Sequence, residues 1–149
     1  MYDTIVWATD GSSHADGALA AALDLLAPNG RLVAFHCDER FTGGRSGGAP
    51  LLAAETDRLV KLRAQVSALQ DEGIDAELIV RTTHGSTVAE IVKAAAIYEA
   101  DAIVCGTRGF GIVAGAPAGT VAMRLPHLAS CPVVVVSEQA ADRSALALR

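Results

Sequence analysis

Short apolar runs rich in β-branched residues alternate along this chain with segments whose apolar residues recur every three or four positions. The first pattern is typical of buried strands, and the second of helices that pack with one face against a core. A chain that alternates strand and helix in this way forms a parallel sheet with helices on both faces. The sequence therefore predicts an α/β fold, with strands at 3–9, 31–36, 75–82, 101–105 and 131–137 and helices between them.

Local signals predict where several of these elements begin and end. Ser13 is a candidate N-cap for the first helix, and Thr87 with Glu90 has the spacing of a capping box for the third. The segment 28–30, Pro-Asn-Gly, is predicted to end the first helix. Residues 38–50 carry four glycines and are predicted to form a surface loop.

Composition limits the classes of protein to which the chain can belong. Its 149 residues are about the length of one domain, and none of its apolar runs approaches the ~20 residues of a membrane span. The start of the chain lacks the pattern of a signal peptide, and the three cysteines form no CxxC pair, which favours a reduced, cytoplasmic protein. A net charge of -5 argues against a nucleic-acid surface. We therefore expect a single cytoplasmic domain that binds neither membrane nor nucleic acid.

A glycine-rich segment follows the fourth predicted strand. The run 106–109, Gly-Thr-Arg-Gly, is followed just before the fourth helix by the pair 119–120, Gly-Thr. Glycine lets backbone N–H groups approach an anion closely, and the start of a helix adds N–H donors that have no partner within the helix. The segment matches neither the Walker pattern, since no lysine follows Gly119, nor the dinucleotide fingerprint. Its layout is nevertheless typical of a loop that binds phosphate groups.

The spacing Gly, two residues, Gly, nine residues, Gly and then Ser or Thr resembles the ATP-binding signature of the universal stress protein family. Four fragments extend the resemblance over nearly the whole chain: IVWATDGS, THGSTVAEIVKAA, ADAIVCGTRG and SCPVVVV. The resemblance implies one Rossmann-like, doubly wound domain over residues 1–137, with five parallel strands in the order 3-2-1-4-5 and helices on both faces. Residues 138–149 form a short tail with no clear packing partner, and we expect it to be loosely ordered.

The resemblance implies ATP as the ligand and places its site at the carboxyl ends of the strands. Asp10 would accept hydrogen bonds from the adenosine part, the alternative being that it only caps the helix or forms a turn with Gly11. Ala8 and His36 would line the adenine pocket, although a histidine that ends a buried strand is commonly structural. The residues implied to bind the nucleotide are Ala8, Asp10, His36, Cys105, Gly106, Arg108, Gly109, Gly119, Thr120 and Val121.

The phosphate end of this site departs from the family pattern. The loop 110–118, FGIVAGAPA, contains no lysine or arginine, where many relatives carry basic residues. The phosphates would then depend on backbone N–H groups, on Arg108 if it turns inward, or on a divalent cation such as Mg²⁺. Pro126 is a second departure, because it is expected to end or kink the fourth helix soon after it starts.

No group of residues in the sequence is typical of an enzyme active site. The four histidines show no metal-ligand spacing, and Ser12 and Ser13 lack the flanking glycines of a nucleophile elbow. The leading hypothesis is a nucleotide-binding stress-response module that at most hydrolyses ATP slowly and acts on a protein partner not named by the sequence. A family member that has lost ATP and serves as a dimeric scaffold is the first alternative, favoured by the loop 110–118. An enzyme of the wider adenine-nucleotide α-hydrolase-like group is the second.

The fifth predicted strand lies at an edge of the sheet in the implied order. It carries an unbroken row of valines, Val133, Val134, Val135 and Val136. An open hydrophobic edge invites pairing, so we expect a homodimer in which this strand pairs antiparallel with its copy across a twofold axis. Family members commonly dimerise in this way. The alternative is that the four valines are core residues, buried by helices on both faces of the sheet.

Overall fold

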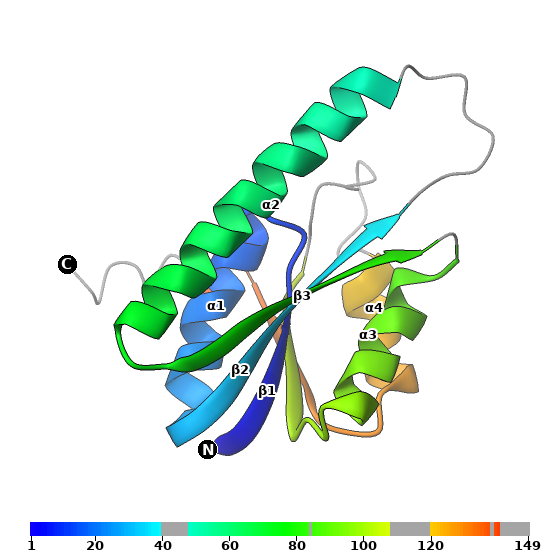
Figure 1. The fold of residues 1–149 in the computed structure, drawn as a ribbon. Coiled ribbons are helices and arrows are strands. Elements are labelled where there is room, and N and C mark those ends of the chain that lie inside the picture. The colour runs from blue at the N-terminus through cyan, green and yellow to red at the C-terminus, as the bar shows by residue number, and fades with distance from the viewer. Residues whose placement is uncertain (40–47, 84, 108–119, 138, 141–149) are drawn as a thin grey trace.

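The computed structural model describes residues 1–39, 48–83, 85–107, 120–137 and 139–140 of the chain (Figure 1). Five parallel strands form one sheet in the order β3-β2-β1-β4-β5, which confirms the predicted α/β fold and strand order. The strands are β1 (Tyr2–Ala8), β2 (Leu26–Glu39), β3 (Asp75–Thr83), β4 (Ala102–Gly106) and β5 (Val133–Val136). The helices are α1 (Ser13–Leu25), α2 (Gly48–Asp71), α3 (Thr87–Ile97) and α4 (Thr120–Leu128).

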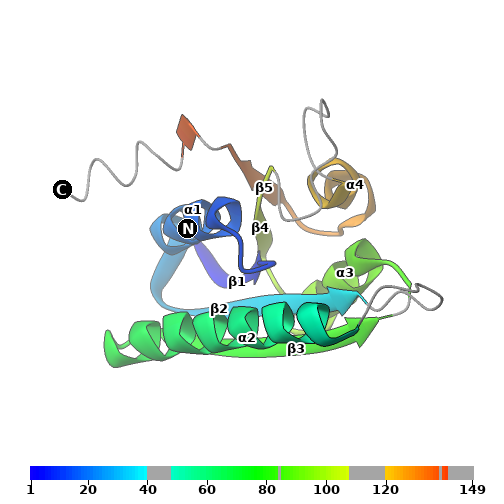
Figure 2. The ribbon, with the colours of Figure 1, turned by 90° about the horizontal axis from the view of Figure 1, so that it is seen from above.

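Two helices cover each face of the sheet, α1 and α2 on one and α3 and α4 on the other (Figure 1). The view from above in Figure 2 shows α2 lying along β2 and β3. Successive side chains of β1 point to opposite faces, so Ile5 and Trp7 join the core under α1 and α2, whereas Val6 and Ala8 join the core under α3 and α4. Trp7 is fully buried, and its Nε1 donates a hydrogen bond of 3.0 Å to the carbonyl oxygen of Ala15. No helix in the described part of the chain is both long and apolar enough to span a membrane.

The N-caps of α1 and α3 each lie one residue before the predicted position. Ser12, not Ser13, caps α1, and its side-chain oxygen accepts a hydrogen bond from the N–H of Ala15. Ser86, not Thr87, caps α3 in the same way. Both cap residues have extended backbone angles, as an N-cap requires, whereas the residue that follows is already helical. Adjacent hydroxyl residues made each cap ambiguous from sequence alone.

The segment 28–30, predicted to end the first helix, lies within β2 instead. α1 ends at Leu25 and β2 starts at Leu26, so the strand is longer than the predicted 31–36 at both ends. The irregular residues are accommodated by a shift in the β1–β2 register and by a positive φ of 63° at Asn29. A Cβ at Gly30 would lie 2.9 Å from the carbonyl oxygen of Ala27, which explains why a glycine stands there.

The last helix and the last strand also differ in their bounds from the prediction. α4 includes Pro126 and ends two residues after it, at Leu128, and the N–H of Ala129 still donates to the carbonyl oxygen of Leu125. β5 is shorter than the predicted 131–137, and Val135 is its most exposed residue, at 37%. Of the predicted tail, 138–149, only residues 139–140 are described. Of the predicted surface loop, 38–50, residues 40–47 lie outside the described part, whereas 38–39 belong to β2 and 48–50 to α2.

Candidate functional site

The order of the strands changes direction between β1 and β4. β1 has two neighbours in the sheet: β2, the next strand along the chain, pairs with one side of β1, and β4 pairs with its other side. The β1–β4 pairing runs from Ile5 with Ala102 to Trp7 with Val104. The turn after β1 and Gly106 at the end of β4 therefore lie next to each other, at the carboxyl ends of two neighbouring strands. In doubly wound α/β proteins, ligands bind in the crevice at such a switch point.

Asp10 lies in the turn between β1 and α1. Its Oδ1 accepts a hydrogen bond of 2.9 Å from the backbone N–H of Ser12, and Gly11 has a φ of +79°. The N–H of Gly11 donates to Oγ1 of Thr9 at 3.1 Å. Asp10 is thus a turn residue, as the alternative interpretation held. A carboxylate has two oxygens and about four lone-pair sites, so forming the turn is compatible with binding a ligand.

His36 is buried with both ring nitrogens engaged. Its Nδ1 lies 3.0 Å from the carbonyl oxygen of Thr9, and its Nε2 lies 2.6 Å from Oε1 of Glu55 on α2. The exposed fraction of the residue is 2%. Because a carbonyl oxygen can only accept, Nδ1 carries the proton of the first bond. The side chain supports the turn after β1, and a contribution of His36 to an adenine pocket stays a prediction.

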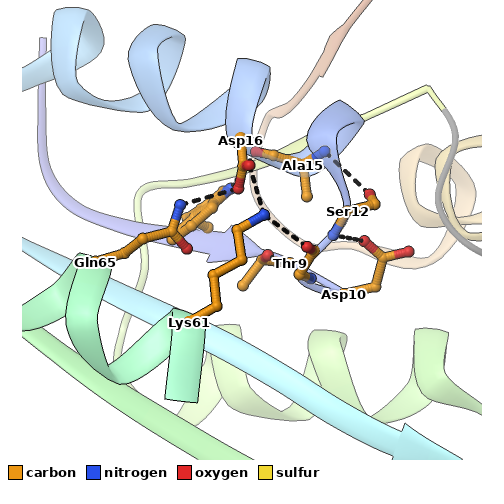
Figure 3. A network of polar contacts seen from close by, with 9 residues as sticks. Thr9, Asp10, Ser12, Ala15, Asp16, Lys61 and Gln65 are labelled. Carbon is orange, nitrogen blue, oxygen red and sulfur yellow. Dashed lines mark hydrogen bonds and ion pairs between the residues drawn. The ribbon is translucent and has the colours of Figure 1, made fainter. Parts of the chain in front are cut away.

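Three further side chains hold this turn, and none of them was predicted to do so: Asp16 on α1 and Lys61 and Gln65 on α2. Nζ of Lys61 donates to the carbonyl oxygen of Gly11 at 2.8 Å and to Oδ2 of Asp16 at 2.6 Å. Nε2 of Gln65 donates to Oδ1 of Asp16 at 2.9 Å. Figure 3 shows Lys61 reaching from α2 to both acceptors. Lys61 and Gln65 are four residues apart, which puts them on one face of a helix, and this spacing is visible in the sequence. The spacing does not reveal their partner, Asp16 on α1.

The structure gathers three of the implied binding residues into the core below the switch point. Ala8 and Cys105 belong to the buried apolar cluster under α3 and α4, and Val121, which is partly buried, packs against it. Gly106 ends β4 opposite Val136. Thr120 is the first residue of α4, so the helix begins one residue earlier than predicted. Three of the implied residues, namely Arg108, Gly109 and Gly119, lie outside the described part of the chain, together with the loop 110–118.

The thiol of Cys105 is a buried, protonated group at physiological pH. Burial raises its pKa from 9.0 to about 11. Only the thiolate reacts with alkylating reagents, so we expect native Cys105 to react at least ~100-fold more slowly with iodoacetamide near pH 8 than the same residue in unfolded protein. Mass spectrometry of the peptide that contains Cys105, after timed labelling with and without guanidinium, measures this ratio. Equal rates in the two states would contradict the burial of this thiol.

The described residues include no group of three or more His, Cys, Asp or Glu placed to hold a metal ion. The polar groups at the switch point are the Asp10 carboxylate and the backbone N–H and C=O groups of the turn after β1. Side-chain contacts hold this turn in place. This set of groups suits hydrogen bonding to a ligand.

A model of the universal stress protein family matches residues 1–137 of the chain. The universal stress protein in the QAH/OAS sulfhydrylase 3′ region of Thermus aquaticus is 33% identical over 139 residues, which cover 91% of this chain and 99% of that protein. Among solved structures, the universal stress protein UspA from Lactobacillus plantarum has a TM-score of 0.74 at 19% identity. That match covers 91% of this chain and 97% of the other.

Two further solved structures of the same fold contain a nucleotide. A universal stress protein in complex with cAMP has a TM-score of 0.60 at 24% identity, over 91% of this chain and 97% of that one. A universal stress protein family protein from Arabidopsis thaliana with AMP bound has a TM-score of 0.62 at 15% identity, over 90% of each chain. At these identities the likeness concerns the fold.

Proposed function

The chain belongs to the universal stress protein family, and we propose that it binds ATP at the switch point between β1 and β4 and acts as a regulatory module. The observation that carries this proposal is the position of Asp10 and Gly106 at one edge of the sheet, beyond the paired residues of two adjacent strands. The occupied and empty forms would present different surfaces to a protein partner. The AMP and cAMP complexes of two proteins of this fold support an adenine nucleotide as the ligand.

Each end of the nucleotide would be held by a different part of the site. The Asp10 carboxylate lies in the turn after β1 and would accept hydrogen bonds from the hydroxyl or amino groups of the adenosine part. The phosphates would lie between the glycine-rich segment after β4 and the start of α4 at Thr120. The first N–H groups of a helix have no partner within the helix and favour an anion.

A dimeric scaffold that does not bind ATP is the second candidate function. The sequence of the loop 110–118 favours it, because the loop supplies no basic side chain to the phosphates. The position and exposure of β5 support a dimer whether or not the protein binds ATP. This strand is the edge of the sheet, with Val133 and Val134 half-buried and Val135 more exposed. Nucleotide binding therefore distinguishes the two candidates, whereas dimerisation does not.

Asp10→Asn tests the adenosine end of the site. Asparagine keeps one oxygen to accept the Ser12 N–H, so the turn is retained, but it replaces the other carboxylate oxygen with an N–H₂ donor. We expect calorimetry to show affinities for Mg-ATP and AMP reduced by the same factor, about 10-fold or more, as for the loss of one hydrogen bond to a charged group. Wild-type protein that gives no heat with either nucleotide would favour the scaffold.

Asp24→Asn is the matched control for this experiment. Asp24 is exposed on α1, away from the turn after β1, and the substitution removes the same charge. We expect its affinities to stay within about twofold of wild type, since surface charges contribute little. An equal loss in the two variants would mean that net charge, not the Asp10 contact, governs binding.

A further inference from the structure

We infer that Lys61 is a positioning residue for Asp10 and acts on it through the peptide group between Gly11 and Ser12. The inference rests on the proposed function, because it assigns Asp10 to the bound nucleotide. Lys61 comes from α2, whereas Asp10 lies in the turn between β1 and α1. The connection between them is a chain of two hydrogen bonds across one planar group.

The two bonds are attached to opposite ends of the same peptide group. Nζ of Lys61 lies 2.8 Å from the carbonyl oxygen of Gly11. The N–H of Ser12, at the other end of that peptide, donates to Oδ1 of Asp10 at 2.9 Å. Figure 3 shows both bonds, with the peptide between the lysine and the carboxylate. A cation at the carbonyl oxygen polarises the peptide and strengthens the hydrogen bond that its N–H donates.

The backbone of the turn fixes the direction in which this peptide points. Gly11 has a φ of +79°, which other residues rarely adopt, and a Cβ there would lie 3.4 Å from Cβ and Cγ of Arg58 on α2. Ser12 is held in turn as the N-cap of α1, through the N–H of Ala15. The turn is therefore enclosed between α2 and the first residues of α1.

Lys61 is itself held in place by its second acceptor. Its Nζ lies 2.6 Å from Oδ2 of Asp16, and the other oxygen of that carboxylate accepts from Gln65. The side chains of Lys61 and Asp16 are 40% and 33% exposed, so the ion pair is screened by water and contributes little to stability. We therefore expect the loss of Lys61 to change the position of the Asp10 carboxylate more than the free energy of unfolding.

A merely structural role gives a different expectation. If Lys61 only tied α2 to α1, its removal would lower the melting temperature and would leave the affinity of the folded protein for a nucleotide unchanged. If Lys61 instead contacted the phosphates directly, its removal would weaken ATP binding much more than AMP binding. A positioning role predicts an equal loss for ATP and AMP, since both carry the adenosine part.

Lys61→Met is the variant that tests the inference, because methionine retains an apolar stem without the ammonium. Arg63→Met is the matched control: Arg63 is exposed on the same helix, and the change in net charge is the same. By calorimetry we expect Lys61→Met to lower the affinities for Mg-ATP and AMP by about fivefold to tenfold, the size of one positioning hydrogen bond, and Arg63→Met to leave them within about twofold.

Combination with Asp10→Asn makes the test specific. Once the carboxylate is replaced, Lys61→Met should cause little further loss, since two residues that act through one contact are not additive. Additive losses in the double variant would overturn the inference, as would an unchanged affinity in Lys61→Met or a loss confined to ATP. Each of these results would leave the proposed binding of ATP by the wild-type protein in place.

A spectroscopic measurement on the protein without nucleotide tests the same contact independently. The amide proton of Ser12 should move upfield in Lys61→Met, because its hydrogen bond to Asp10 weakens, and should not move in Arg63→Met. A Ser12 resonance unchanged in both variants would overturn the inference even if nucleotide binding were confirmed. A wild-type protein that binds no adenine nucleotide would contradict the proposed function, and with it the nucleotide half of this inference.

Discussion

Valine in place of Gly119 is expected to lower the affinity for ATP by about 100-fold while the affinity for adenosine changes little. Gly119 immediately precedes Thr120, the first residue of α4, where N–H groups have no partner within the helix. A branched side chain there would keep the phosphates away from these donors. A hydrogen bond to a charged group contributes about 1.5–3 kcal/mol, so the loss of one or two of them corresponds to about two orders of magnitude.

Gly85→Val is the matched control for this prediction. Gly85 lies between β3 and α3, and within the described part of the chain a Cβ there would meet only Oγ1 of Thr83, at the ordinary distance of 3.6 Å. Calorimetry with Mg-ATP and with adenosine on both variants measures the effect. We expect the ratio of the two affinities to change only in Gly119→Val. An unchanged ATP affinity in that variant would remove the glycine signature from the proposed site.

The expected pattern separates the two ends of the ligand. Asp10→Asn should weaken ATP and AMP equally, whereas Gly119→Val should act on ATP and spare adenosine. Since the loop 110–118 supplies no basic residue, we expect phosphate binding to depend more heavily on backbone donors than it would with a lysine in this loop. A protein that binds AMP and ATP with similar affinity would indicate that the adenosine end dominates.

The fold was predictable because each element carries its own local pattern. The apolar runs of β1 and β4 and the stripes of Leu62, Val66 and Leu69 on α2 are buried as their periodicities require. Periodicity does not determine which strands are neighbours, so the correct strand order came from the family resemblance. The misplaced boundaries have local causes. In β2, for example, Asn29 adopts a positive φ inside a strand, where Pro-Asn-Gly ordinarily marks a turn.

The candidate site was predictable only in part. Asp10 and Gly106 could be placed at the switch point because one follows and the other ends an apolar strand, and because the strand order implied by the resemblance makes these two strands neighbours. The contacts that hold Asp10 could not be predicted, because they join residues distant in sequence. Lys61 reaches Asp16, and Glu55 reaches His36, only through the way in which α2 packs on the sheet. Ion pairs between helices leave no spacing signature in a single sequence.

We also expect the protein to dimerise through β5, and the hydrogen bonds of this strand show which of its residues face a partner. The carbonyl oxygens of Pro132 and Val136 accept hydrogen bonds from the N–H groups of Ile103 and Thr107 on the β4 side. Alternate residues of a strand point their N–H and C=O groups to opposite sides, so those of Val135 point to the outer edge. Among the described residues, no strand pairs with that edge.

Val135→Pro is therefore expected to weaken dimerisation while keeping the β4–β5 pairing. Proline removes an N–H that faces the partner, and the bonds to β4 come from the alternate residues. Val135→Thr is the control, because it keeps both the N–H and the β-branched shape. By sedimentation at micromolar concentration we expect wild-type protein and Val135→Thr to be dimers, and the dissociation constant of Val135→Pro to rise by at least ~10-fold, for one lost hydrogen bond at each of two symmetric positions. Wild-type protein that sediments as a monomer would contradict the dimer, and an unchanged dissociation constant in Val135→Pro would place its interface elsewhere.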